Sequence, residues 1–326
     1  MSKICKEDII FIAGANGMAG RAIKKTFIKN GYNLLLTPNR SELNLLDLKA
    51  VQKWFTINKP TVVVIAAAKV GGILANTKEP TEFLLENLKI QINLIETSWK
   101  NGVKRLLFLG SSCIYPKFAT QPIEEEELLS GSLEKTNQWY AIAKIAGIKL
   151  CDALRAQYNF DAISIMPTNL YGPGDNYNPA TSHVMASLIR KFYKAKKESL
   201  PAVTCWGSGS PYREFLYSDD LGSATVFLLE NWDPEAINAP LNNKGVPHTF
   251  LNVGSGFEIK IKDLAKKIAD LIEYKGDILW DNRKPDGTPR KILNCKKLER
   301  LGWKSTISLE EGILKTFESF EKEQII

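Results

Sequence analysis

Histidine and cysteine are scarce in this sequence, whose 326 residues include two histidines and five widely spaced cysteines. The cysteines form no CxxC motif and have no histidine nearby at metal-ligand spacing, so the sequence predicts neither a disulfide framework nor a metal site. Scattered free thiols are typical of the reducing cytosol. The five residues are Cys5, Cys113, Cys151, Cys205 and Cys295.

Long apolar runs are also missing. The longest, Val62–Ala68, is far shorter than the roughly 18 residues that a membrane helix needs. The N-terminal run Ile9–Ala13 follows charged residues and is interrupted by Gly14, which is unlike a signal peptide. We therefore expect a soluble, cytoplasmic protein.

The composition is that of an ordinary globular protein, with 44% hydrophobic and 24% charged residues. At about 150 residues per domain, the length predicts two domains. The 43 basic and 36 acidic residues give a net charge of +7. This charge permits an acidic partner, either a polyanion or a phosphorylated small molecule, and composition alone does not choose between them.

The first 110 residues alternate between strand-like and helix-like patterns. The uninterrupted apolar run that begins at Thr61 suits a parallel sheet covered on both faces. Strands that alternate with helices through short connections predict an α/β fold with a doubly wound, Rossmann-type parallel sheet. The expected strands are 8–14, 33–37, 61–68 and 103–110, and the expected helices are 18–30, 48–58 and 81–100.

Beyond about residue 168 the sequence becomes rich in turn residues, and a helical pattern follows at 184–197. We expect a dinucleotide-binding domain at 1–168 and a smaller C-terminal α/β substrate-binding domain at 169–326. The stretch 214–230 is expected to return to the first sheet.

Three glycines, Gly14, Gly17 and Gly20, lie between the first strand and the first helix. In this position the first makes a tight turn, the second admits a pyrophosphate, and the third allows close helix–strand packing. The helix N-terminus then offers free N–H groups to the phosphates. The segment therefore predicts a dinucleotide site.

The end of the second strand favours NADP(H) over NAD. An acidic residue there would bind the ribose 2′-hydroxyl, whereas an arginine accommodates a 2′-phosphate. Arg40 is the first charged residue after the strand, and Glu42 comes later.

Tyr140 and Lys144 are four residues apart and share one face of a predicted helix. A neighbouring ammonium group is expected to lower the pKa of the phenol and so to permit proton transfer near neutral pH. Ser111 follows a strand that ends at the ligand crevice, where it can share a hydrogen bond with the substrate oxygen and Tyr140.

Together these features resemble the extended short-chain dehydrogenases/reductases that act on nucleotide sugars. Further segments resemble the GDP-L-fucose synthases, which epimerise GDP-4-keto-6-deoxy-D-mannose at C3 and C5 and then reduce its 4-keto group with NADPH. The resemblance covers about residues 8–318. The segments that carry it are 43–47, 66–73, 109–117, 140–151, 166–173, 206–209, 213–215 and 284–291.

The resemblance implies a role for each catalytic side chain. Cys113 and His183 would exchange protons at C3 and C5, which the 4-keto group acidifies. Tyr140 would protonate the C4 alkoxide, Ser111 would polarise the carbonyl, and Lys144 would also bind the nicotinamide ribose.

The resemblance also implies which residues bind the two ligands. Asn16 occupies a position where some relatives have a cation, and Lys191 one where arginine is more usual, so Lys191 lacks the bidentate fork. The substrate-binding residues would be Lys191, Trp206, Arg213 and Asp286. The cofactor-binding residues would be Gly14, Ala15, Asn16, Gly17, Met18, Ala19, Gly20, Arg40, Asn44, Leu45, Leu109, Gly110, Ser111, Ser112, Tyr140, Lys144, Pro167, Thr168, Asn169, Leu170 and His183.

Several alternatives stay open. A sister synthase of the GDP-colitose type is poorly separated by sequence. Another nucleotide-sugar enzyme on the same scaffold, such as a 4-epimerase or a 4,6-dehydratase, is a second alternative, although a dehydratase would place a carboxylate pair where Cys113 and Ile114 stand. A dinucleotide-sensing regulator would be expected to lack the Tyr140–Lys144 pair, and no basic stripe interleaved with aromatics favours nucleic acid. Apolar patterns at 83–99 and 141–154 predict a homodimer through a four-helix bundle, as in relatives.

Overall fold

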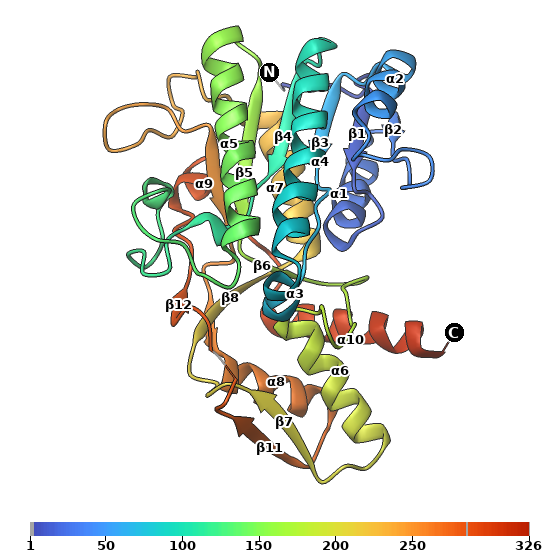
Figure 1. Ribbon diagram of the computed structural model, residues 1–326, viewed down its shortest axis with the longest axis vertical. Helices are drawn as coiled ribbons and strands as arrows, with labels where there is room; N and C mark the ends of the chain where they lie inside the picture. Colours follow the sequence, from blue (N-terminus) through green and yellow to red (C-terminus); the bar gives the residue numbers. More distant parts are fainter. Residues whose placement is uncertain (1–2, 285, 326) are drawn as a thin grey trace.

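A six-stranded parallel sheet forms the centre of the larger part of the molecule (Figure 1). The computed structural model describes residues 3–284 and 286–325. All strand pairs in this sheet are parallel, and the order is β2-β1-β3-β4-β5-β9. The strands are β1 (Ile10–Ala13), β2 (Leu35–Leu36), β3 (Val62–Ile65), β4 (Arg105–Leu109), β5 (Ala162–Pro167) and β9 (Phe250–Val253).

Helices cover both faces of this sheet, which explains its uninterrupted apolar strands. In β3, Val62 and Val64 point into one core, whereas Val63 and Ile65 point into the other, and all four are fully buried. The predicted doubly wound α/β fold is confirmed. The covering helices are α1 (Met18–Lys29) and α7 (Ser218–Asn231) on the first face, and α2 (Leu48–Asn58), α4 (Pro80–Lys100) and α5 (Gln138–Tyr158) on the second.

Local sequence signals set several helix ends. Asp47 accepts a hydrogen bond from the backbone N–H of Ala50 and caps α2. Pro80 opens α4 at a position where its missing N–H costs nothing. Gly31, with φ at 80°, follows the last turn of α1.

The smaller part of the molecule has its own core beneath the large sheet in Figure 1. One small sheet has the order β10-β8-β12 with β6 also paired to β8, and a second consists of β11 and β7. Its strands are β6 (Asn169–Tyr171), β7 (Ala202–Trp206), β8 (Tyr212–Tyr217), β10 (Glu258–Lys260), β11 (Asp277–Asp281) and β12 (Arg290–Lys291). Its helices are α6 (Val184–Lys197), α8 (Ile261–Ile272) and α10 (Leu309–Ile325).

The stretch 214–230, which was expected to return to the first sheet, is divided between the two parts. Its strand, β8, pairs with β6, β10 and β12 rather than with the large sheet. Its helix, α7, packs on the large sheet beside α1. The sixth strand of the large sheet is β9, which lies beside β5.

Short helices complete the connections. They are α3 (Ile73–Lys78), η1 (Ser112–Ile114), η2 (Glu125–Glu127) and α9 (Lys296–Arg300). Two of them, α3 and η1, border the site described next.

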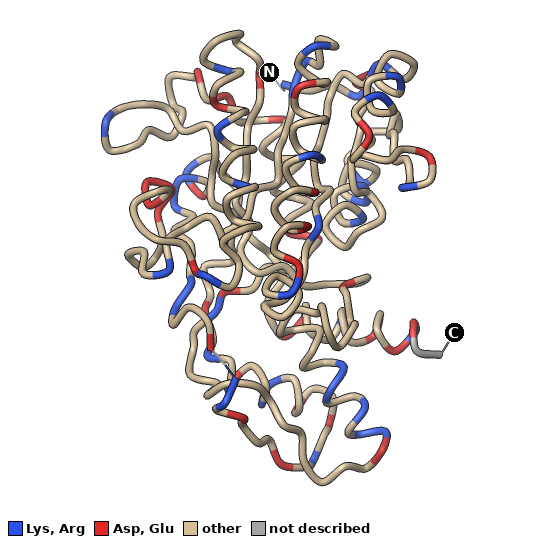
Figure 2. The backbone as a smooth tube through the Cα atoms, in the orientation of Figure 1, with Lys and Arg blue, Asp and Glu red and all other residues tan. Residues whose placement is uncertain are grey.

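None of the helices in the described residues is long and apolar enough to cross a membrane. In Figure 2, basic and acidic residues are interspersed over both parts, so the net charge of +7 is distributed rather than gathered on one face of this view.

Candidate active site

One cavity of about 1270 Å³ extends from the turn after β1 to the small sheet. The ends of β1, β3, β4 and β5 all open into it, because the carboxyl ends of parallel strands meet at one edge of a sheet. Every site residue proposed from the sequence lines this cavity. The structure thus brings the whole set together, and the role of each residue stays a prediction.

The glycine turn fits a dinucleotide. Gly14 has φ at 86°, and a Cβ atom there would lie 2.7 Å from the Ala67 backbone. At Gly20 a Cβ atom would lie 2.1 Å from the Gly14 carbonyl oxygen, so only glycine allows α1 to begin this close to β1. Gly17 is the N-cap of α1 and provides no side-chain cap, which leaves N–H groups of the first turn for a ligand phosphate.

Arg40 lies on the cavity rim beyond β2 and is exposed. The nearby carboxylate of Glu42 accepts a hydrogen bond from the backbone N–H of Asn39 at 2.7 Å, so it serves the turn itself. The charge at this rim therefore suits a phosphate rather than a ribose hydroxyl.

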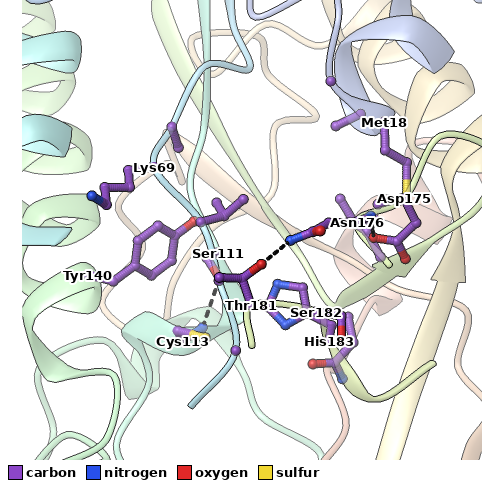
Figure 3. Close-up of a pocket in the computed structure, with 18 of the residues that line it drawn as sticks. Met18, Lys69, Ser111, Cys113, Tyr140, Asp175, Asn176, Thr181, Ser182 and His183 are labelled. Atoms are coloured by element: carbon purple, nitrogen blue, oxygen red, sulfur yellow. Dashed lines mark hydrogen bonds between the residues drawn. The ribbon is translucent and has the colours of Figure 1, made fainter. Parts of the chain in front are cut away.

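Tyr140 and Lys144 lie in the first two turns of α5. Ser111 follows β4 and lies near Tyr140 (Figure 3). The Ser111 hydroxyl lies close enough to the phenol of Tyr140 to lower its pKa. Lys144 Nζ donates to the Leu109 carbonyl at 2.8 Å and lies 5.8 Å from the centroid of the Tyr140 ring. Burial lowers the pKa of Lys144 to about 7.

The expected effect of Lys144 on Tyr140 is wrong for the protein without ligands. Burial raises the pKa of Tyr140, the neighbouring Cys113 raises it further, and only the Ser111 hydrogen bond lowers it. The physical reason is that Lys144 is itself desolvated and bonded to a backbone carbonyl, so its charge is not directed at the phenol oxygen. The phenol of Tyr140 is therefore protonated near neutral pH.

Cys113 lies in η1, the short helix that begins directly after Ser111. The Ser111 hydroxyl accepts a hydrogen bond from the Cys113 backbone N–H. Lys291, from β12, donates to Cys113 Sγ at 3.8 Å. Sequence reasoning did not single out Lys291, although it ends the segment 284–291 that carried part of the resemblance. Its ammonium group places a positive charge beside the Cys113 sulfur.

His183 is the N-cap residue of α6 and borders the same cavity as Tyr140 and Cys113 (Figure 3). Desolvation in the cleft, followed by the charge of Lys291, lowers the pKa of His183 below its usual value. The imidazole is therefore neutral near pH 7, and one of its nitrogens can accept a proton.

Positive charge and an aromatic ring gather at the far end of the cavity. The Trp206 ring lies 5.7 Å from Lys191 Nζ and 5.3 Å from Lys284 Nζ, measured to the ring centroid. Arg213 pairs in register with Lys291 between β8 and β12, so both cations come from one ladder. Lys284, another residue missed from the sequence, is the first residue of the segment 284–291.

Asp286 is held in a fixed position at this end. Its carboxylate accepts hydrogen bonds from the Ser208 backbone N–H at 2.7 Å and the Ser208 hydroxyl at 2.8 Å. The Arg213 guanidinium donates to the Asp286 carbonyl at 3.4 Å, and burial lowers the pKa of this arginine. A diphosphate with an attached ring system is the kind of ligand that these groups suit.

A family comparison agrees with this geometry. Residues 10–239 match the NAD dependent epimerase/dehydratase family. The chain belongs to this family. The GDP-L-fucose synthase 1 of Arabidopsis thaliana is 48% identical, over 96% of this chain and 93% of its own length. The GDP-L-fucose synthase of Escherichia coli (strain K12) is also 48% identical, over 97% of each chain. A GDP-L-colitose synthase from Yersinia pseudotuberculosis is 36% identical, over 97% of this chain and 98% of its own.

Solved structures share the architecture. A GDP-6-OMe-4-keto-L-xylo-heptose reductase from C. jejuni superposes with a TM-score of 0.92 at 32% identity, covering 98% of this chain and 99% of the reductase. A GDP-L-fucose synthetase from Naegleria fowleri bound to NADP has a TM-score of 0.86 at 26% identity, covering 99% of this chain and 96% of the synthetase.

Proposed function

We propose that this protein is a GDP-L-fucose synthase that uses NADPH. It epimerises GDP-4-keto-6-deoxy-D-mannose at C3 and C5 and then reduces the 4-keto group. The observation that carries the proposal is that the Ser111–Tyr140 pair, Cys113 and His183 border one cavity, which the dinucleotide turn also enters. Identities of 48% over nearly whole chains to GDP-L-fucose synthases support it.

Epimerisation uses the acidity that the 4-keto group gives to C3 and C5. Removal of either proton gives an enolate, whose oxygen the Ser111 and Tyr140 hydroxyls would stabilise by hydrogen bonds. Cys113 and His183 reach the cavity from different elements, η1 and the start of α6, so they can act on opposite faces of the sugar ring. One removes a proton and the other returns one, which inverts the centre.

Reduction uses the same oxygen site. When bound, NADPH supplies the hydride that C4 receives. Tyr140 donates its phenolic proton to the C4 oxygen as charge develops there, and burial keeps that phenol protonated by raising its pKa. Ser111 remains hydrogen-bonded to the same oxygen. One set of side chains therefore serves both half-reactions.

The glycine turn, Arg40 and Lys144 would hold the cofactor, with Arg40 at the 2′-phosphate and Lys144 at the nicotinamide ribose. Asn16 brings no charge to this site, so Arg40 has the larger share of NADPH selectivity. Arg213 and Lys191 would meet the substrate diphosphate, and the lysine contributes charge without a fork. Because the cations of this cavity would bind the phosphates of the cofactor and the substrate, the net positive charge does not require a polyanionic partner.

We also propose a homodimer formed through α4 and α5, in the cytosol. These two helices pack side by side (Figure 1), and apolar side chains on them remain exposed. These are Leu85, Ile92, Trp139 and Ile142. Two copies of this face would form a four-helix bundle. Light scattering should give twice the chain mass, and Ile92→Asp should give one chain mass; a wild-type monomer would contradict the dimer.

The decisive experiment incubates the protein with GDP-4-keto-6-deoxy-D-mannose and NADPH in deuterated water. We expect NADPH oxidation, deuterium at C3 and C5, and NMR couplings of the L-galacto configuration. Reduction without inversion would identify a simple 4-reductase. Activity only on a 3-deoxy substrate would identify a colitose-type synthase instead. Cys113→Ala should stop the exchange, and exchange at the wild-type rate in that variant would refute the assignment of this thiol.

A further inference from the structure

A segment of the larger part crosses to the smaller part at the cavity. We call residues 66–78 the strap; it runs from the end of β3 through α3 to the start of α4. In Figure 1, α3 lies where the two parts of the molecule meet. Strap residues Lys69 to Leu74 line the cavity, yet the mechanism above assigns them no role.

The base of the strap is firmly attached to α4. The side chain of Asn87, which is buried, accepts from the Lys69 backbone N–H at 2.9 Å and donates to the Lys69 carbonyl at 3.0 Å. Lys69 Nζ also forms ion pairs with Glu79 at 2.8 Å and Glu86 at 3.3 Å. The two carboxylates balance the charge of Lys69, and these contacts together hold the base of the strap against α4.

The tip of the strap contacts the segment that leads into His183. The Gly72 backbone N–H donates to the Thr181 carbonyl at 2.9 Å. A Cβ atom at Gly72 would lie 2.7 Å from the Ser182 carbonyl oxygen, a separation that real Cβ atoms essentially never show. The backbones of 72 and 181–182 are therefore packed as closely as glycine permits.

Other contacts of this segment are internal. The backbone N–H groups of Thr181 and Ser182 both donate to the Asn178 carbonyl, at 3.3 and 2.9 Å. The Asn176 amide donates to the Thr181 hydroxyl at 2.7 Å (Figure 3). These bonds shape the loop but do not attach it to the catalytic strand ends. The Gly72 contact does so, because the strap continues directly from β3.

We propose that Gly72 is a positioning residue that sets His183 against the sugar ring from the nucleotide-binding side of the molecule. The strap fixes Thr181 two residues before His183, so the imidazole is located relative to Cys113 and Tyr140 rather than only to the smaller part. This inference rests on the proposed function, since it assigns His183 to proton exchange. Tyr140 rather than His183 donates the proton during reduction, so the strap affects reduction less than exchange.

The test compares Gly72→Ala with Gly131→Ala. Gly131 has only ordinary contacts, because a Cβ atom there would lie 3.4 Å from Pro116, and it does not line the cavity. We expect Gly72→Ala to slow solvent-deuterium exchange at C3 and C5 roughly 10- to 100-fold, the cost of a misplacement near 1 Å. More of its reduced product should keep the starting configuration. NADPH affinity should match wild type, and Gly131→Ala should be normal throughout.

A second variant covers the case in which Gly72→Ala fails to fold, which loss of NADPH binding would reveal. Asn76→Ala removes an amide that donates to the carbonyls of Gly71 at 2.8 Å and Gly72 at 3.2 Å, so it loosens the same tip without adding an atom. It should also slow exchange more than reduction. Wild-type exchange in a folded Gly72→Ala, or equal losses of exchange and NADPH binding in both variants, would overturn the proposal. A wild-type protein that neither exchanges nor reduces would instead overturn the proposed function.

Discussion

The larger and smaller parts of the molecule build their halves of the cavity in different ways. In the larger part, β1, β3, β4 and β5 are buried along their whole length, and the candidate catalytic residues Ser111 and Cys113 come shortly after β4. In the smaller part, β7 alternates buried and exposed residues, and its cations come from α6, β8 and the segment 284–291. Rigid strand ends suit chemistry that needs fixed geometry, whereas a rim of long side chains suits recognition by charge.

The larger and smaller parts contact each other at Cys113. This thiol belongs to the larger part, yet Lys291 of the smaller part lies 3.8 Å from its sulfur. The comparison therefore predicts that changes at the candidate catalytic side chains alter single steps, whereas changes at the cations of the smaller part alter how tightly the substrate is held.

The largest effect is expected for Tyr140→Phe. Loss of the proton donor should slow NADPH oxidation by roughly 100- to 10,000-fold. Deuterium exchange at C3 and C5 should be slowed much less, because Ser111 still stabilises the enolate oxygen. Stopped-flow oxidation and NMR exchange measure the two steps separately. Tyr158→Phe, at the exposed end of the same helix, is the matched control. Equal loss of both steps would show that Tyr140 is not specific to reduction.

Arg213→Ala should weaken substrate binding without changing the order of steps. A charge-assisted hydrogen bond contributes about 1.5–3 kcal/mol, so KM for the GDP-sugar should rise roughly 10- to 150-fold. NADPH affinity should stay constant. Arg283→Ala, at an exposed guanidinium paired with Asp281, is the control and should leave KM unchanged. An unchanged KM in Arg213→Ala would remove this residue from the substrate site.

Arg40→Ala should reduce affinity for NADPH about tenfold, because one charge-assisted contact to the 2′-phosphate is lost. Affinity for NADH, which lacks that phosphate, should be unchanged and provides the internal control. Fluorescence titration of both cofactors measures this. Equal weakening of the two would place Arg40 elsewhere than at the 2′-phosphate.

The buried lysine predicts how cofactor binding depends on pH. Lys144 has a pKa of about 7 in the free protein, and the negative charge of a bound cofactor should raise it. Binding should then take up a proton above pH 7, so that NADPH affinity falls as pH rises through that range. Calorimetry at about pH 8 in two buffers of different ionisation enthalpy measures the uptake. Lys144→Met should abolish the uptake; its persistence there would assign the proton to another group.

The smallest effect is expected for Lys291→Met, at the contact between the two parts, and it concerns the pKa of His183. Lys291→Met removes a positive charge that lowers the pKa of His183, so that pKa should rise. It should remain below its usual value, because desolvation, the larger cause, is unchanged. NMR titration of the His183 ring measures the shift, with the His248 signal as reference. A pKa that falls or does not move would show that Lys291 acts only on Cys113.

Much of the larger part could be predicted from the sequence because its signals are local. The glycine turn, the Tyr140–Lys144 spacing and the apolar strands each depend on residues a few positions apart. The position of β8 could not be read in this way, because its three partners come from 169–171, 258–260 and 290–291. An apolar pattern indicates that a strand exists but leaves its sheet undecided.

The site shows the same division at the level of single residues. Lys291 and Lys284 were passed over because a cation in a turn-rich segment is usually exposed to solvent. Gly72 was noted only as part of a motif, since its close approach to Ser182 joins positions 110 residues apart in the chain. The direction of the Tyr140 pKa shift was wrong because burial, which depends on everything packed around the phenol, is its largest cause.

By itself, the sequence determined the doubly wound sheet and the dinucleotide turn, since each is encoded in short-range periodicity or spacing. The candidate catalytic residues Cys113 and His183 came instead from the family resemblance. Only the tertiary structure decided which distant groups lie together. These are Lys291 with Cys113, Arg213 with Lys291, and the strap with the segment before His183. The physical reason is that such contacts depend on strand pairing and loop closure between distant segments, whose energies no local pattern contains.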